Sequence, residues 1–212
     1  MAAPDVIVLG GSAGGMNAVR EVLTTLTGLR TSVLCVVLHR PPEYSPLAEV
    51  LQTYTPLPVH EPPDSPWHCP LGAVTVAPAG YHLLLGRGRA RSTDGKEAIA
   101  PYTTAPGVRA HLTLDEPVAY SRPSLDVTFT SAAEFGASVV AVLLSCANDD
   151  GAARCAAVQA AGGRVVLQAP ATCEAPIAVN AALRRIEPDH VADPAGIGTW
   201  LAQQLALGAK PH

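Results

Sequence analysis

The sequence is poor in aromatic residues and has no basic surplus, and both shortages exclude classes of protein. Phe, Trp and Tyr make up 4% of its 212 residues, too few for a surface that stacks single-stranded nucleic acid. The 14 lysines and arginines are outnumbered by 18 aspartates and glutamates, which gives a net charge of −4 and a pI of about 5.9. Since nucleic-acid-binding surfaces usually carry a basic stripe, we expect no nucleic-acid partner.

Cysteine pairs and long apolar runs are also lacking. The five cysteines are odd in number, widely spaced and without a Cys-x-x-Cys pair, so neither a disulfide framework nor a metal site is expected. The longest apolar run, around residues 139–144, is too short to cross a bilayer. The amino terminus lacks the basic and apolar regions of a signal peptide. We therefore expect a cytoplasmic protein without membrane insertion.

What is present is enough apolar material for a substantial core. Hydrophobic residues make up 48% of the chain, charged residues 15%, and the mean hydropathy is +0.23, which argues against disorder. The length predicts a single domain over residues 1–212, with its core at about 5–190 and a closing helix at 194–207.

Strand-like and helix-like segments alternate along the chain. Residues 6–9 form a short continuous apolar run, typical of a strand buried on both faces, and a glycine-rich turn and a helical pattern follow it. Further strands are expected at 32–38, 139–145 and 164–168, and helices at 43–53, from 152, at 177–185 and at 194–207. This alternation predicts a three-layer α/β/α doubly wound fold with a mostly parallel sheet.

The middle of the chain departs from this alternation. Residues 73–77 and 81–85 are two apolar runs separated by a Pro-Ala-Gly turn, which predicts an antiparallel β-hairpin. The glycine-rich and charged segment 86–97 is expected to be a surface hairpin tip.

The first glycine-rich turn has two interpretations. A dinucleotide-binding Gly-x-Gly-x-x-Gly motif starting at Gly10 needs glycine at position 12, where Ser12 stands, and an acidic residue at the end of the next strand, where His39 stands. The same turn satisfies Gly-x-Ser-x-Gly with Gly10, Ser12 and Gly14, which would present the serine hydroxyl at a helix amino terminus. A serine in such a turn is more often only a helix cap. Ser12 is therefore a candidate nucleophile only if a base and an acid lie beside it.

Partners for the serine are expected at neighbouring strand ends. His39 ends the second strand, and the carboxyl ends of adjacent parallel strands meet at one edge of the sheet. The loop after residues 139–144 supplies Asp150, with Asp149 as its rival, although Asp150 would also suit a helix cap. The chain order Ser, His, Asp differs from that of α/β-hydrolases, so their fold is set aside.

Five short segments, in order, resemble one known family. They are Gly-Gly-Ser-Ala-Gly-Gly at 10–15, Leu-His-Arg-Pro-Pro at 38–42, Val-Ala-Pro-Ala-Gly at 76–80, Ser-Arg-Pro-Ser-Leu-Asp-Val at 121–127 and Asn-Asp-Asp-Gly-Ala at 148–152. Together they are similar to the catalytic domain of the CheB chemoreceptor methylesterases, over about residues 5–185.

The resemblance implies that Ser12 is the nucleophile, His39 the general base and Asp150 the orienting acid. It implies hydrolysis of glutamate γ-methyl esters on the cytoplasmic helices of chemoreceptors, releasing methanol, with glutamine deamidation as an additional candidate reaction. The oxyanion donors would be the backbone N–H groups of Ala13 and Ala147. No metal or organic cofactor is implied.

Several positions depart from the family pattern. Ala13 replaces a threonine, Arg40 replaces a methionine beside the base, where its charge would oppose formation of the imidazolium, and Cys146 and Asn148 replace glycines. Cysteine does not easily adopt a left-handed backbone, which puts the direction of the Ala147 N–H in question.

The alternatives are therefore a catalytically weakened domain kept for protein interaction, an esterase with another protein methyl ester as substrate, and the disfavoured nucleotide-binding module. The length leaves no room for the amino-terminal receiver domain that family members usually carry, so control by a partner is expected. Nothing in the sequence marks an oligomer face.

Overall fold

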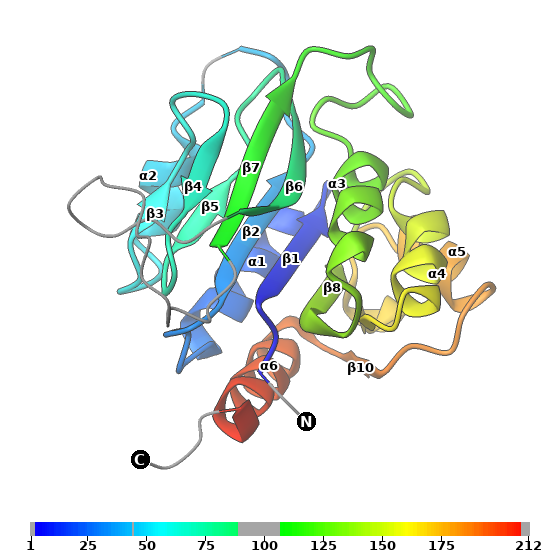
Figure 1. Cartoon of the computed structure of the whole chain (residues 1–212). Helices are drawn as coiled ribbons and strands as arrows, with labels where there is room; N and C mark the ends of the chain where they lie inside the picture. Colours follow the sequence, from blue (N-terminus) through cyan, green and yellow to red (C-terminus); the bar gives the residue numbers. More distant parts are fainter. Residues whose placement is uncertain (1–2, 44, 89–106, 209–212) are drawn as a thin grey trace.

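The computed structural model describes residues 3–43, 45–88 and 107–208, and a large parallel sheet with helices on both faces dominates it (Figure 1). The strands are β1 (Val6–Gly11), β2 (Val33–Leu38), β3 (Val59–His60), β4 (Trp67–Cys69), β5 (Val74–Val76), β6 (His82–Gly88), β7 (Gly107–Thr113), β8 (Val139–Leu143), β9 (Arg164–Gln168) and β10 (His190–Ala192). The α-helices are α1 (Gly15–Thr25), α2 (Leu47–Gln52), α3 (Leu125–Ala132), α4 (Ala152–Ala160), α5 (Ile177–Leu183) and α6 (Pro194–Gly208), and short 3₁₀ turns lie at Ala133–Ser138 and Pro170–Thr172.

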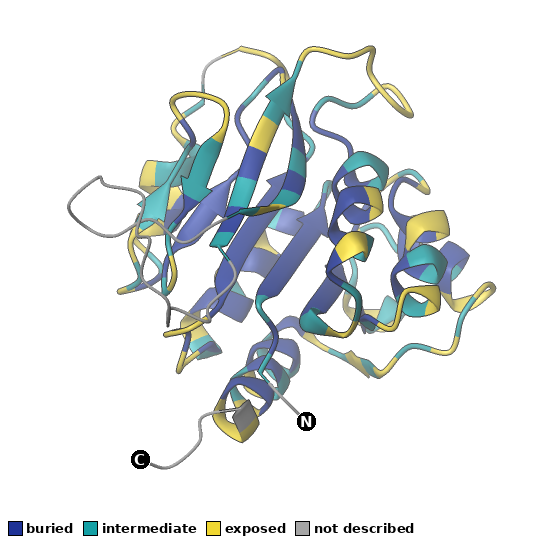
Figure 2. Ribbon diagram, viewed as in Figure 1, coloured by how far each residue is buried: buried dark blue, intermediate teal, exposed yellow. Residues whose placement is uncertain are grey.

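The central strands are buried on both faces, as Figure 2 shows. In β1, Val6 and Val8 join an apolar cluster that includes Phe129 of α3, whereas Ile7 and Leu9 join a second cluster with α1 and α6. Every residue of β1, β2 and β8 is buried, which explains why their sequences read as continuous apolar runs instead of alternating. The expected three-layer arrangement is confirmed.

The strand order places the ends of three strands at one edge. The large sheet runs β10-β9-β8-β1-β2-β5-β3, with all neighbours parallel, so the chain builds outward from β1 in both directions. Gly11 pairs with Leu38 of β2, and Gly10 pairs with Leu143 of β8. The residues that follow β1, β2 and β8 therefore meet where open α/β sheets hold their ligands.

The expected hairpin of residues 73–77 with 81–85 is wrong. β5 lies inside the parallel sheet between β2 and β3, whereas β6 belongs to a separate three-stranded sheet of order β4-β7-β6. All three residues of β5 are buried, which suits an interior strand and not a half-exposed hairpin. At Gly80 the backbone is left-handed (φ +74°), and here the chain passes from one sheet to the other instead of reversing.

The middle of the chain does contain an antiparallel strand pair, but it is formed by β6 and β7 and not by residues 73–77 and 81–85. Gly88 pairs with Gly107, so β6 continues through Gly86, where a hairpin tip was expected. The rest of the predicted tip, from residue 89 to 97, lies outside the described residues. No helix in the described ranges is long and apolar enough to cross a membrane.

Candidate active site

Ser12 lies in the tight turn between β1 and α1. Its backbone N–H donates to the carbonyl of Ser145 (2.9 Å), and its own carbonyl accepts from Gly15 N–H (2.7 Å). Gly14, which precedes α1, has φ +74°, and a Cβ there would lie 2.6 Å from Glu174 Cβ. Only glycine meets both conditions, so the glycine-rich sequence is what allows the chain to turn so sharply at Ser12.

The start of α1 offers hydrogen-bond donors beside Ser12. Among the described residues, no acceptor is found for the backbone N–H groups of Ala13 and Gly14. Unpaired N–H groups at a helix amino terminus, together with the positive end of the helix dipole, favour a negatively charged oxygen. The turn can therefore stabilise an oxyanion formed at Ser12.

His39 follows β2 and is hydrogen-bonded to Asp150. Its Nε2 lies 2.7 Å from Oδ2 of Asp150, and the two side chains are 10% and 0% exposed. An ionised carboxylate only accepts hydrogen bonds, so Nε2 carries the proton. The Nδ1 of neutral His39 is therefore its basic nitrogen.

Asp150 sits at the amino terminus of α3 and accepts four hydrogen bonds. Its Oδ2 accepts from His39 and from Leu125 N–H (2.7 Å), and its Oδ1 accepts from Ser124 Oγ–H (2.9 Å) and Asp126 N–H (2.9 Å). Burial alone would raise the pKa of Asp150, but the bonds from His39, Asp126 and Leu125 outweigh it and hold the pKa below its ordinary value. The carboxylate is thus ionised and fixed in direction.

The neighbouring acids take other positions. Asp149 is exposed, and its carbonyl accepts the N–H of Ala152 at the start of α4. Asp126 accepts the N–H of Gly151 (2.9 Å), and burial together with the charge of Asp150 raises the pKa of Asp126. Of the two acids left open by the sequence, the structure brings Asp150 to His39.

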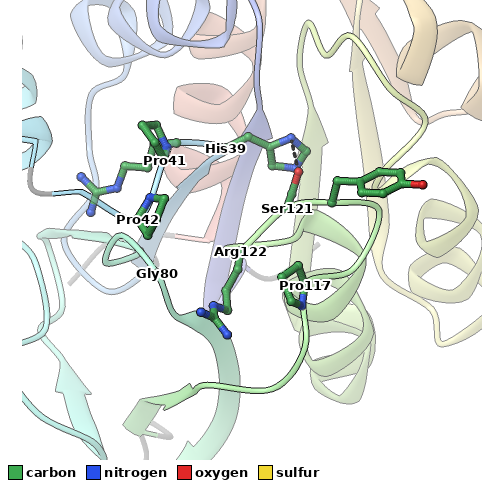
Figure 3. A pocket seen from close by; sticks show the side chains of 9 residues that line it. His39, Pro41, Pro42, Gly80, Pro117, Ser121 and Arg122 are labelled. Atoms are coloured by element: carbon green, nitrogen blue, oxygen red, sulfur yellow. Dashed lines mark hydrogen bonds between the residues drawn. The ribbon is translucent and has the colours of Figure 1, made fainter.

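Ser121 is a site residue that the sequence did not single out. Its Oγ lies 3.1 Å from Nδ1 of His39, and Figure 3 shows the two side chains pointing toward one another. Both line a cavity of about 410 Å³ that also includes Pro42, Pro117 and Arg122. The one available signal was its place at the head of segment 121–127, one of the five segments that carry the family resemblance.

Ser12 and His39 lie side by side but are not joined. Both line a cavity of about 290 Å³, and the backbone N–H of His39 donates to Gly11 O (3.1 Å). The described residues nevertheless show no hydrogen bond between the Ser12 hydroxyl and the His39 ring. The Ser12 hydroxyl lies close enough to the Cys146 thiol to lower the pKa of that thiol, against the larger effect of burial. Burial raises the pKa of Cys146, so this thiol is neutral and does not replace the imidazole as a base.

The loop after β8 accommodates its unusual residues without left-handed backbone. Among the described residues other than glycine, a positive φ is found only at Ala119 and Tyr120, so neither Cys146 nor Asn148 is strained in this way. Asn148 Oδ1 accepts Asp150 N–H (3.2 Å) and the Cys146 S–H (3.0 Å).

Ala147, expected as an oxyanion donor, and Arg40, expected beside the base, make other contacts. Ala147 is exposed, and its N–H lies against the sulfur of Cys146. Arg40 is paired with Glu61 (2.7 Å) and also donates to Ala77 O (2.9 Å), with its side chain only 7% exposed. The positive charge beside His39 is therefore neutralised by a carboxylate.

Buried side chains brace this edge of the sheet. His82 accepts Ser124 N–H at Nδ1 (3.3 Å) and donates from Nε2 to Glu116 O (3.1 Å), which ties the start of α3 to the preceding loop. Ser145 donates to Ala13 O (2.6 Å) and so links the β8 loop to the Ser12 turn. No group of three or more metal-ligating side chains is found within residues 3–43, 45–88 and 107–208.

Comparison with known proteins identifies this arrangement of strand ends. A family model described as CheB methylesterase matches residues 7–201. The chain belongs to the CheB methylesterase family. The solved catalytic domain of the Thermotoga maritima CheB methylesterase superposes with a TM-score of 0.80 and 24% identity, covering 95% of this chain and 99% of that domain, which confirms the fold.

Curated CheB-family relatives carry the name protein-glutamate methylesterase/protein-glutamine glutaminase. The Bordetella parapertussis protein is 34% identical over 171 residues, which are 79% of this chain and 44% of that protein. A Leptospira interrogans protein, named with the prefix putative, is 29% identical over 189 residues, 88% of each chain. The chain thus spans about half the length of some relatives and most of the length of others.

Proposed function

We propose that this CheB-family chain is a serine hydrolase that removes methyl esters from glutamate side chains of chemoreceptor-type proteins. In this proposal Ser12 is the nucleophile, His39 the general base and Asp150 the orienting acid. The observation that carries it is the buried hydrogen bond between His39 Nε2 and Asp150 Oδ2 (2.7 Å), next to a strand-to-helix turn that presents Ser12.

In the first step Ser12 Oγ attacks the ester carbonyl carbon while its proton passes to His39 Nδ1. The C=O π electrons move to the carbonyl oxygen, and the N–H groups of Ala13 and Gly14 are positioned to donate to that oxyanion. Asp150 holds the tautomer of His39 in which Nδ1 is basic and stabilises the imidazolium that forms.

In the second step the oxyanion collapses and the C–OCH₃ bond breaks. The leaving methoxy oxygen takes the proton from His39 Nδ1 and departs as methanol, leaving Ser12 acylated. Water, deprotonated by the same nitrogen, then attacks the acyl group and restores Ser12. A glutamine side chain would follow the same steps with ammonia leaving, in keeping with the double name of the relatives.

The experiment is methanol release from a methylated chemoreceptor cytoplasmic fragment. We expect the wild-type chain to release methanol and Ser12→Ala to release it only at the background rate. An activated ester serves as a second substrate, because turnover of that ester without release from the receptor would point to a different methyl ester as substrate.

A second candidate is a catalytically weakened domain that serves protein interaction. The observation that favours it is the absence, in the described residues, of a hydrogen bond between Ser12 and His39. If neither substrate shows turnover that depends on Ser12, this second function replaces the first.

A further inference from the structure

The basic nitrogen of His39 already has a partner, and that partner is not Ser12. With the proton of neutral His39 on Nε2, facing Asp150, its Nδ1 offers a single lone pair. The Ser121 hydroxyl, 3.1 Å away, is therefore the donor to this lone pair, since its other acceptor, Ala119 O, is more distant at 3.5 Å. Since one lone pair accepts one strong hydrogen bond, donation from Ser121 and donation from Ser12 exclude each other.

The turn that carries Ser121 has an unusual backbone. Val118 and Ser121 exchange backbone hydrogen bonds of 3.1 and 2.9 Å, and the two residues between them, Ala119 and Tyr120, have φ of 48° and 62°. Neither is glycine or asparagine, so both residues hold a left-handed backbone that their side chains disfavour. Such strain concentrates at functional sites and persists only where the surroundings impose it.

The surroundings of this turn do impose it. Asn148, from the loop that holds Asp150, donates from Nδ2 to Ala119 O (3.3 Å). On the other side, Arg122 Nη1 donates to the carbonyls of Leu114 (3.0 Å) and Asp115 (3.1 Å). Ser121 is thus held against His39 from both flanks, and one of these contacts comes from the loop of the site itself.

One side chain joins the turn that carries Ser121 to the loop after β8. Asn148 donates from Nδ2 to Ala119 O (3.3 Å), and its Oδ1 accepts the Cys146 S–H (3.0 Å). Cys146 in turn lies close enough to Ser12 for the Ser12 hydroxyl to lower the pKa of the thiol. His39 therefore has a hydrogen-bond partner other than Ser12, and the loop beside Ser12 holds that partner's turn in place.

We propose that Ser121 is a positioning residue that holds His39 in a resting state, in which Nδ1 is withheld from Ser12 until bound substrate displaces the Ser121 hydroxyl. This rests on the proposed function, because it takes Ser12 as the nucleophile. Activation then consists of an exchange of donors at Nδ1, with the Ser121 O–H leaving and the Ser12 O–H entering, and with no change in the His39–Asp150 bond.

The test compares Ser121→Ala, Ser121→Thr and Ser12→Ala in the full chain with p-nitrophenyl acetate as substrate. Removing the competing donor by Ser121→Ala is expected to raise kcat/KM about five-fold, the equivalent of one net hydrogen bond. Ser121→Thr keeps a hydroxyl and is expected to stay within about two-fold of wild type. Ser12→Ala is expected to abolish turnover.

A second readout separates positioning from a general effect on folding. In protein labelled with [¹⁵N]histidine, the Nδ1 resonance of His39 is expected to move toward that of an unbonded nitrogen in Ser121→Ala and to stay in Ser121→Thr. An unchanged resonance would overturn the proposal, as would an unchanged or lower kcat/KM in Ser121→Ala while Ser12→Ala is inactive. Turnover that persists in Ser12→Ala would instead overturn the proposed function.

Discussion

The two halves of the site differ in how firmly they are held. On one side, Asp150 is 2% exposed and accepts four hydrogen bonds, three of them from residues at the start of α3, so that His39 has a fixed tautomer. On the other side, Ser12 is part-exposed and is not bonded to His39 within the described residues. With the roles proposed above, the acid and the base are pre-organised in this fold, and their coupling to Ser12 would be made on substrate binding.

The largest effect is expected from the nucleophile half. Ser12→Ala should lower kcat by about 10⁴–10⁶-fold, as loss of a catalytic serine does elsewhere, measured by methanol release from methylated receptor. Because the Ser12 side chain is part-exposed and its backbone bonds to Ser145 and Gly15 are kept in the variant, the melting temperature should stay within about 2 °C of wild type. A large loss of stability would show that the Ser12 hydroxyl supports the fold.

The acid half should respond in both activity and stability. Asp150→Asn is expected to lower kcat by about 10⁴-fold, because the amide disturbs the tautomer of His39. It should also cost about 2 kcal/mol in the free energy of unfolding, because charge-assisted bonds to α3 are weakened. Asp149→Asn is the matched control, since that side chain is exposed, and it should change either quantity little.

Acid titration tests how strongly the ionised Asp150 carboxylate stabilises the fold. The pKa of Asp150 is lowered in the folded protein, so its ionised form stabilises the fold at every pH above the unfolded value of about 3.9. That stabilisation is lost as the pH falls from there through the lower folded pKa. Urea unfolding of wild type and Asp150→Asn between pH 6 and pH 2.5 should therefore converge at low pH, and parallel curves would contradict the account.

The smallest effects on activity are expected from the glycines of the turns. Gly14→Ala should cost about 2–3 kcal/mol of unfolding free energy, from a left-handed backbone (φ +74°) and from a Cβ placed 2.6 Å from Glu174 Cβ. It should also lower kcat, since the Ser12 turn must shift. Gly28→Ala is the control: its φ is +80°, but the nearest atom, Leu205 Cβ, is 4.0 Å away, so only the backbone cost of about 1 kcal/mol is expected. Equal costs in urea titrations would show that the Gly14 turn is not close-packed.

The sequence predicted those elements whose signal is local. β2 and β8 are continuous apolar runs, β1 begins with one, and β9, with three apolar residues between Arg164 and Gln168, was expected at the residues where it is found. α3 was missed because Val127, Thr128 and Thr130 are β-branched and favour helix weakly, whereas the buried Leu125 and Phe129, one turn apart, bind the helix to the core. β7 was missed because its pairing with β6 joins residues far apart in the chain.

The site residues likewise divide into those with a local sequence signal and those that only distant contacts reveal. Ser12 and His39 follow strand ends and could be named from their positions. Position alone left Asp149 as a rival of Asp150, which the family resemblance favoured, and in the structure Asp150 is the buried one of the two. Ser121 lies outside any predicted strand end, and only the packing of its turn against His39 reveals it. Likewise, the ion pair of Arg40 with Glu61 depends on a residue just after β3 that no motif connects to the site.

The most direct test of the account is to identify which serine a fluorophosphonate modifies. The reagent reacts covalently with a serine that is activated by a base and faces oxyanion donors. After reaction of the full chain, proteolysis and mass spectrometry should place the adduct on Ser12 alone, with no adduct in Ser12→Ala or Asp150→Asn. An adduct on Ser121 would contradict the account, because the serine bonded to His39 would then be the nucleophile and not its resting partner.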